Sequence, residues 1–102
     1  QFPEMARNLA KMGTDLIVCP TWGWEWIYGP ARAYENGIFV ASAMAVPYWM
    51  PIEDLRRPSM VVSPDGKILS EGPTDKAAIV YCEINDIHCK QSREFRLNTS
   101  LR

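Results

Sequence analysis

The strongest nucleophiles that this sequence offers are three cysteines, Cys19, Cys82 and Cys89. A catalytic thiol needs a base or a cation beside it to form the thiolate. The one histidine of the sequence, His88, lies far along the chain from Cys19. We therefore interpret Cys19, which ends a short apolar run, as a buried structural thiol, with a reactive Cys19 as the alternative. The cysteine spacing fits no zinc site, so reduced, mostly buried thiols of a cytosolic protein are the simplest account.

The remaining titratable residues form no recognisable acid–base pair. Four carboxylates could act together in principle, and they are Glu25, Glu35, Glu53 and Asp54. Neighbours such as Glu53 and Asp54 point apart on most backbones, and Glu35-Asn36 is expected to support the backbone at a helix end. His88 reads as a surface histidine. No glycine-rich phosphate loop and no nucleophile elbow are present. The residues alone therefore predict no catalytic group, no metal and no cofactor.

An aromatic stretch, TWGWEWIY at residues 21–28, is the most unusual feature of the composition. It follows a predicted strand, and loops at strand ends often line a substrate pocket. Large aromatic side chains also dominate cores and subunit contacts. The sequence leaves these two interpretations open.

The overall composition indicates a folded protein without an obvious charged partner. Hydrophobic residues make up 47% of the 102 residues, which is enough for a packed core, and the net charge is −1. This charge balance gives no global attraction to nucleic acid or to an anionic membrane. No apolar run approaches the roughly 18 residues of a membrane span, and no signal peptide is visible. We expect a cytoplasmic location.

Two helices and two strands are expected in the first half of the chain. Phe2, Met5, Leu9 and Met12 recur at helical spacing, which predicts an amphipathic helix from Pro3 that stops at Gly13. The run 15–19 predicts a strand buried on both faces and ended by Pro20. A second helix is expected over 30–36 with Gly37 as its cap, and a second strand over 38–46.

The second half predicts a hairpin and a further strand. Residues 47–58 hold three prolines and predict a loop. Residues 59–63 and 67–70 flank the turn Pro64-Asp65-Gly66, which predicts a β-hairpin. A strand over 77–84 and a polar helical tail from Asp86 follow. The order predicts a layered α/β sheet with antiparallel pairing toward its end, in which two helices leave one face to be covered by something else.

Several of these segments, in the same order, resemble the nitrilase superfamily of carbon–nitrogen hydrolases. The resemblance lies in Phe2-Pro3-Glu4, in the helix ending at Gly13, in the strand after it, in the run Ala31-Arg-Ala-Tyr-Glu-Asn36 and in the hairpin 59–70. It implies that residues 1–102 form the carboxyl-terminal part of such a domain, as the second half of an αββα sandwich. The sequence departs from the family pattern at Gln1, at Gly29-Pro30 and at Arg57-Pro58.

The resemblance implies a hydrolase of amides or nitriles whose reacting groups lie outside this chain. In the family a cysteine nucleophile precedes the Phe-Pro-Glu element, and a lysine and two glutamates lie earlier still. The family's active site is bordered by the loop at Pro20, Thr21 and Trp22, so these residues are expected to bind substrate. A small amide or nitrile substrate, a homo-oligomer and an inactive isolated segment are implied. The alternative is a non-catalytic binding or assembly module of the same fold.

Overall fold

The computed structural model describes residues 3–21, 28–45, 58–74 and 76–85, together with Ile87, Cys89 and Gln91. The helices and strands in chain order are α1 (Pro3–Lys11), β1 (Leu16–Thr21), α2 (Tyr28–Asn36), β2 (Phe39–Met44), β3 (Met60–Val62) and β4 (Ile68–Glu71). The loop predicted over 47–58 and most of the aromatic stretch lie outside the described residues. None of the described helices is long and apolar enough to cross a bilayer.

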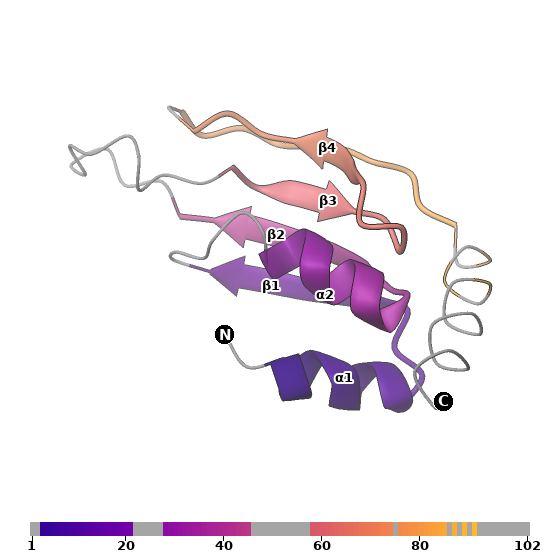
Figure 1. The fold of residues 1–102 in the computed structure, drawn as a ribbon. Coiled ribbons are helices and arrows are strands. Elements are labelled where there is room, and N and C mark those ends of the chain that lie inside the picture. The colour runs from indigo at the N-terminus through magenta and orange to yellow at the C-terminus, as the bar shows by residue number, and fades with distance from the viewer. Residues whose placement is uncertain are drawn as a thin grey trace.

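The four strands form one mixed sheet in the order β1-β2-β3-β4 (Figure 1). β1 pairs with β2 in parallel, while β2–β3 and β3–β4 are antiparallel. The predicted hairpin is confirmed: the Ser63 amide donates to the Lys67 carbonyl at 2.9 Å, and the Gly66 amide to that of Ser63 at 2.9 Å. These bonds close the turn that Pro64-Asp65-Gly66 predicted.

One face of this sheet carries the core. α2 lies across it and contacts β2 and β3 (Figure 1). The buried side chains between helix and sheet come from both layers, and they are Ala10, Ala33, Ile38, Val40, Met60 and Val62. The predicted second helix and its glycine cap are confirmed, since α2 ends at Asn36 and Gly37 has a positive φ of 64°. The mixed α/β arrangement with an unclosed sheet confirms the predicted fold class.

The other face of the sheet is exposed along β1, and here the prediction of a strand buried on both faces is wrong. Leu16 and Val18 point away from α2 and are exposed, whereas Ile17 and Cys19 pack toward the core. Pro20 does not end the strand either, because β1 continues to Thr21 with Pro20 opposite Ala43. β1 is an edge strand of the described sheet, where a missing amide donor costs no ladder hydrogen bond on the outer side.

The apolar side of α1 also faces outward. Met5, Leu9 and Met12 are exposed, and Ala10 is the one residue of this helix that is buried. α1 contacts α2, and the Arg7 guanidinium donates to the Glu35 carbonyl at 3.0 Å. The helix and its stop at Gly13 are as predicted, with the apolar stripe exposed rather than packed in the core.

The predicted strand over 77–84 is wrong, because the structure gives these residues no regular strand pairing. They run back along β4 (Figure 1), where Ile79 and Tyr81 are exposed. Strands are stabilised by packing of their side chains against a neighbouring layer, and no described element covers these two. Beyond this segment, Cys89 is helical, as the tail prediction requires, and its buried thiol donates to the Asp15 carbonyl at 3.1 Å.

Gly66 in the hairpin turn gives a test of the local geometry. Its φ is +81°, and an added Cβ would lie 3.3 Å from the Tyr34 Cβ. Gly13 has a similar φ of +93° with nothing near. Gly66→Ala is expected to lower the free energy of unfolding by about 1–2 kcal/mol, more than the matched Gly13→Ala, because it adds crowding to backbone strain. Urea unfolding followed by tryptophan fluorescence measures both; equal losses would contradict the role of the Tyr34 contact.

Candidate functional site

The carboxyl ends of β1 and β2 define the candidate site. The two strands are parallel, so their ends lie at one edge of the sheet, and Thr21 is the register partner of Met44. The first turn of α1 lies at the same end of the molecule (Figure 1). In α/β sheets, ligands bind beyond the carboxyl ends of parallel strands. This edge is therefore where the fold can present side chains to a substrate.

Two of the three residues predicted to bind substrate fall at this edge. Pro20 is exposed within β1, and Thr21 is the last residue of that strand. Trp22 lies outside the described residues. Their role in binding stays a prediction, but the strand that leads to them ends at the expected edge.

Glu35 and Asn36 have structural contacts, as the sequence interpretation holds. The Arg32 guanidinium donates to a Glu35 carboxylate oxygen at 2.9 Å and lies 5.7 Å from the centre of the Tyr28 ring. Asn36 is fully buried, and its side-chain amide donates to the Arg32 carbonyl at 2.9 Å. These contacts fix the end of α2. The other predicted acid–base candidates, Glu25, Glu53, Asp54 and His88, lie outside the described residues.

The three cysteines differ in environment. Cys89 is buried and Cys19 is half-buried, while Cys82 is exposed, so the prediction of mostly buried thiols is wrong for Cys82. Burial raises the pKa of the Cys19 thiol above its ordinary value of 9.0. A raised pKa leaves less thiolate at neutral pH, which is the opposite of what a catalytic cysteine needs.

Alkylation separates these thiols. Iodoacetamide is expected to label Cys82 first, Cys19 more slowly and Cys89 last, because labelling needs both access and thiolate. Since the pKa of Cys19 is raised, its labelling rate should still be climbing above pH 9.0, where an ordinary thiol approaches its plateau. Peptide mass spectrometry over a pH series measures this. Fast labelling of Cys19 at neutral pH would revive the alternative of a reactive Cys19.

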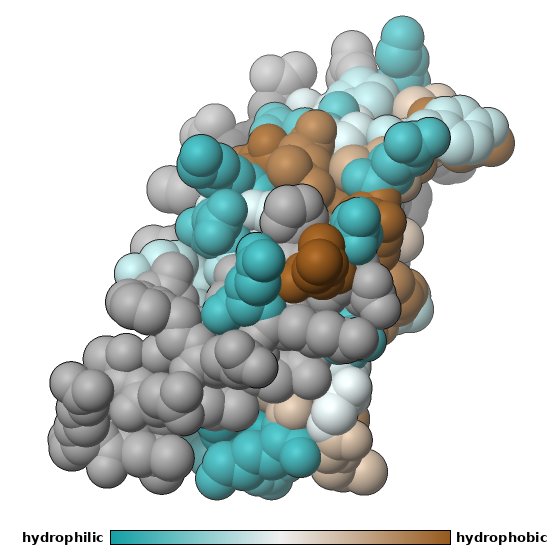
Figure 2. All heavy atoms as spheres, turned by 90° about the vertical axis from the view of Figure 1, so that its right-hand side faces the viewer, coloured by the Kyte–Doolittle hydropathy of each residue, from teal (hydrophilic) through white to brown (hydrophobic). Residues whose placement is uncertain are grey.

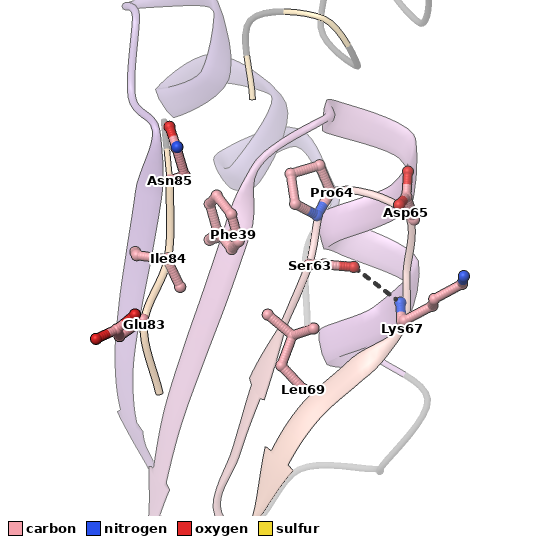
Figure 3. A pocket seen from close by; sticks show the side chains of 9 residues that line it. All are labelled: Phe39, Ser63, Pro64, Asp65, Lys67, Leu69, Glu83, Ile84 and Asn85. Carbon is pink, nitrogen blue, oxygen red and sulfur yellow. Dashed lines mark hydrogen bonds between the residues drawn. The ribbon is translucent and has the colours of Figure 1, made fainter. Parts of the chain in front are cut away.

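Of the cavities among the described residues, two bear on the candidate site, and sequence reasoning found neither. The first, here called the edge cavity, has a volume of about 220 Å³ and is lined by Met44, Ser59, Gly72, Pro73, Lys76, Ala77, Ala78 and Val80. The second, here called the hairpin cavity, has about 460 Å³ and is lined by Phe39, Ser63, Pro64, Asp65, Lys67, Leu69, Glu83, Ile84 and Asn85 (Figure 3). No sequence pattern marks Lys67 or Lys76 as a cavity residue; Lys67 is distinguished only by its place after the predicted turn.

The hairpin cavity belongs to the open side of the sheet. Phe39 and Leu69 lie on its floor between the hairpin and the segment 83–85 (Figure 3). Figure 2, which views the molecule from the side of the hairpin turn, shows hydrophobic side chains at the surface there among hydrophilic ones. Of these two cavities, the edge cavity adjoins the candidate site, through Met44. Among the described residues, no three histidine, cysteine or acidic side chains cluster as metal ligands would.

Comparison with solved structures gives the same fold. The NitFhit protein of C. elegans matches with a TM-score of 0.83 and 26% identity, over 99% of this chain and 26% of its own. Nit3 of Saccharomyces cerevisiae, a member of branch 10 of the nitrilase superfamily, matches with a TM-score of 0.72 and 24% identity, over 92% of this chain and 37% of its own.

An amidase variant from Nesterenkonia sp. AN1 matches with a TM-score of 0.65 and 31% identity, over 99% of this chain and 40% of its own. This chain thus spans between about a quarter and two fifths of the length of these relatives. No protein with a curated description gives a significant sequence match. The family model described as carbon-nitrogen hydrolase matches residues 1–94. With this match over nearly all of its length, the chain belongs to the carbon–nitrogen hydrolase family, within the nitrilase superfamily.

Proposed function

We propose that this chain is the carboxyl-terminal part of an enzyme that hydrolyses the C–N bond of a small amide or nitrile. The observation that carries the proposal is the family match over residues 1–94, which includes the Phe2-Pro3-Glu4 element. In the family pattern this element follows the nucleophilic cysteine. The nucleophile then lies about four positions before Gln1, and none of the residues in this chain reacts with the substrate.

The chemistry of a solved relative supports a cysteine nucleophile. A variant of the Nesterenkonia amidase carries the acetamide moiety of fluoroacetamide covalently attached at its active-site cysteine. Within this chain, Cys19 has a raised pKa and Cys89 is buried, so neither is suited to that role. With an amide, the upstream thiolate attacks the carbonyl carbon, a glutamate transfers a proton to the leaving ammonia, and one water then hydrolyses the thioester. With a nitrile, addition of the thiol gives a thioimidate, which takes up one water and releases ammonia to give the same thioester, and a second water hydrolyses it. A lysine and a backbone N–H stabilise the negative charge that develops on the substrate oxygen or nitrogen.

This chain contributes one wall of the active site in the proposal. Pro20 and Thr21, at the carboxyl end of β1, contact the substrate together with Trp22, which follows them in the sequence. Glu35 and Asn36 act as supports that hold α2 in place. The exposed Leu16 and Val18 on the open sheet face favour a homo-oligomer. In this proposal the protein is cytoplasmic.

The test is an assay of the full-length protein for ammonia release. A series of short aliphatic amides and the matching nitriles should include a substrate that is turned over, and the isolated 102-residue chain should release none. The non-catalytic module is the second candidate. Absence of turnover across the series, together with a residue other than cysteine about four positions before Gln1, would favour that module.

A further inference from the structure

Within the described structure, α1 is attached to its neighbours through a narrow face. Ala6 and Arg7 are half-buried and Ala10 is buried, at the spacing of one helix face, while the other residues of this helix are exposed. Ala10 belongs to the core cluster. The Arg7 guanidinium donates to the Glu35 carbonyl of α2 at 3.0 Å. With so little of α1 buried, this hydrogen bond is a large part of its attachment.

The bond from Arg7 also caps α2. The Glu35 carbonyl lies in the last turn of that helix, where carbonyls lack a partner within the helix. A guanidinium satisfies such an acceptor and places its positive charge at the negative end of the helix dipole. The two residues are 28 positions apart in the sequence, so the bond joins two separate helices. Arg7 therefore fixes the end of α2 and anchors α1 at the same time.

Arg7 is the anchor nearer to the amino end of α1. At 1.5 Å per residue, Pro3 lies about 6 Å along the axis from Arg7 and about 10 Å from Ala10. If Ala10 were the only anchor, a rotation of α1 by about 6° around it would displace Pro3 by about 1 Å. In the proposed function the cysteine nucleophile lies a few residues before Pro3, so it moves with this end of the helix. A displacement of about 1 Å can cost about 10²-fold in rate.

The other end of the bond belongs to the unit that carries the candidate site. α2 ends at Asn36 and leads directly into β2, whose last residue, Met44, is the register partner of Thr21. The bond to the Glu35 carbonyl thus connects the helix that follows the nucleophile with the strands that end at the substrate. A fixed distance between these two parts is what a productive attack requires.

We propose that Arg7 is a positioning residue, which donates to the Glu35 carbonyl and thereby holds the nucleophile at its productive distance from a substrate at Thr21. This inference rests on the proposed function and adds a residue to it. Arg7 does not touch the substrate, because it acts through α1.

The experiment measures ammonia release by the full-length protein, with kcat expressed per folded molecule from circular dichroism. Arg7→Met is expected to lower kcat by about 10- to 100-fold and to leave KM within about 3-fold, because the nucleophile is displaced while the substrate wall remains. Arg7→Lys keeps the charge and a donor, so it should recover most of the loss. Lys11→Met removes the same charge from an exposed position of the same helix and should keep kcat within about 2-fold.

A second control separates positioning from loss of stability. Gly66→Ala is expected to destabilise the fold in the hairpin, away from α1, and should leave kcat per folded molecule unchanged. An equal loss of kcat in Gly66→Ala or in Lys11→Met overturns the inference, and so does an unchanged kcat in Arg7→Met. These three results leave the proposed function intact. A full-length protein that releases no ammonia from any amide or nitrile overturns the proposed function, and this inference falls with it.

Discussion

In the full-length protein, replacing the cysteine proposed to precede Phe2-Pro3-Glu4 by alanine is expected to lower kcat by at least about 10⁴-fold. The covalent route divides amide hydrolysis into two easier steps, and both pass through a bond to the thiol sulfur. Without that sulfur, water would have to attack a poor electrophile directly. The fold and the bound substrate remain, so KM should change much less than kcat. Steady-state ammonia release measures both constants.

The cysteines of this chain provide matched controls for that substitution. Cys82 is exposed and has no role in the packing of the core, so Cys82→Ala should keep full activity and stability. Cys19→Ala separates the two possible nucleophiles. Cys19 packs against the core from β1, and its raised pKa leaves little thiolate at neutral pH. We therefore expect turnover within about 3-fold of the unchanged protein. A loss of turnover in Cys19→Ala together with an active upstream variant would refute the assignment of the nucleophile.

The sequence predicted those elements whose signals are local. The hairpin was correct because Pro64-Asp65-Gly66 satisfies a turn by itself, with Gly66 supplying the positive φ. Both helices were correct because capping glycines at Gly13 and Gly37 mark their ends. These features need no information about the rest of the molecule. The parallel pairing of β1 and β2 follows from the helix between them.

The errors concern which surfaces are covered. An apolar strand shows which side chains are suited to burial, but it does not show whether a second layer is present to bury them. Leu16 and Val18 are apolar and exposed, and so are Ile79 and Tyr81 in the segment predicted as a strand. In each case the sequence pattern predicts a strand, but no described element covers these side chains.

The candidate site was predictable only in part, and for a related reason. The placement of Pro20 and Thr21 follows from one strand end, which the sequence locates within two residues. The edge cavity instead combines the ends of β2, β3 and β4 with residues 76–80, and no sequence pattern links Met44 with Lys76. A cavity formed by distant segments exists only once the sheet order is known.

The second large effect is expected in the core. Ile38→Ala should lower the free energy of unfolding by about 2–5 kcal/mol, because it removes three carbons from a fully buried side chain and leaves a cavity between α2 and the sheet. Ile38 follows the capping Gly37, and its amide donates to the Ala33 carbonyl at 3.2 Å. The substitution therefore weakens the packing where α2 connects to β2. Urea unfolding followed by tryptophan fluorescence measures the loss of unfolding free energy.

Ile79→Ala is the matched control, since it makes the same chemical change at a side chain that is 78% exposed. In the 102-residue chain it should alter the free energy of unfolding by no more than about 0.5 kcal/mol. The pair of values tests the central difference between the sequence pattern and the structure, because both isoleucines lie in segments predicted as strands. A loss at Ile79 as large as that at Ile38 would mean that another layer, from a second copy of the chain, covers residues 77–84 in solution.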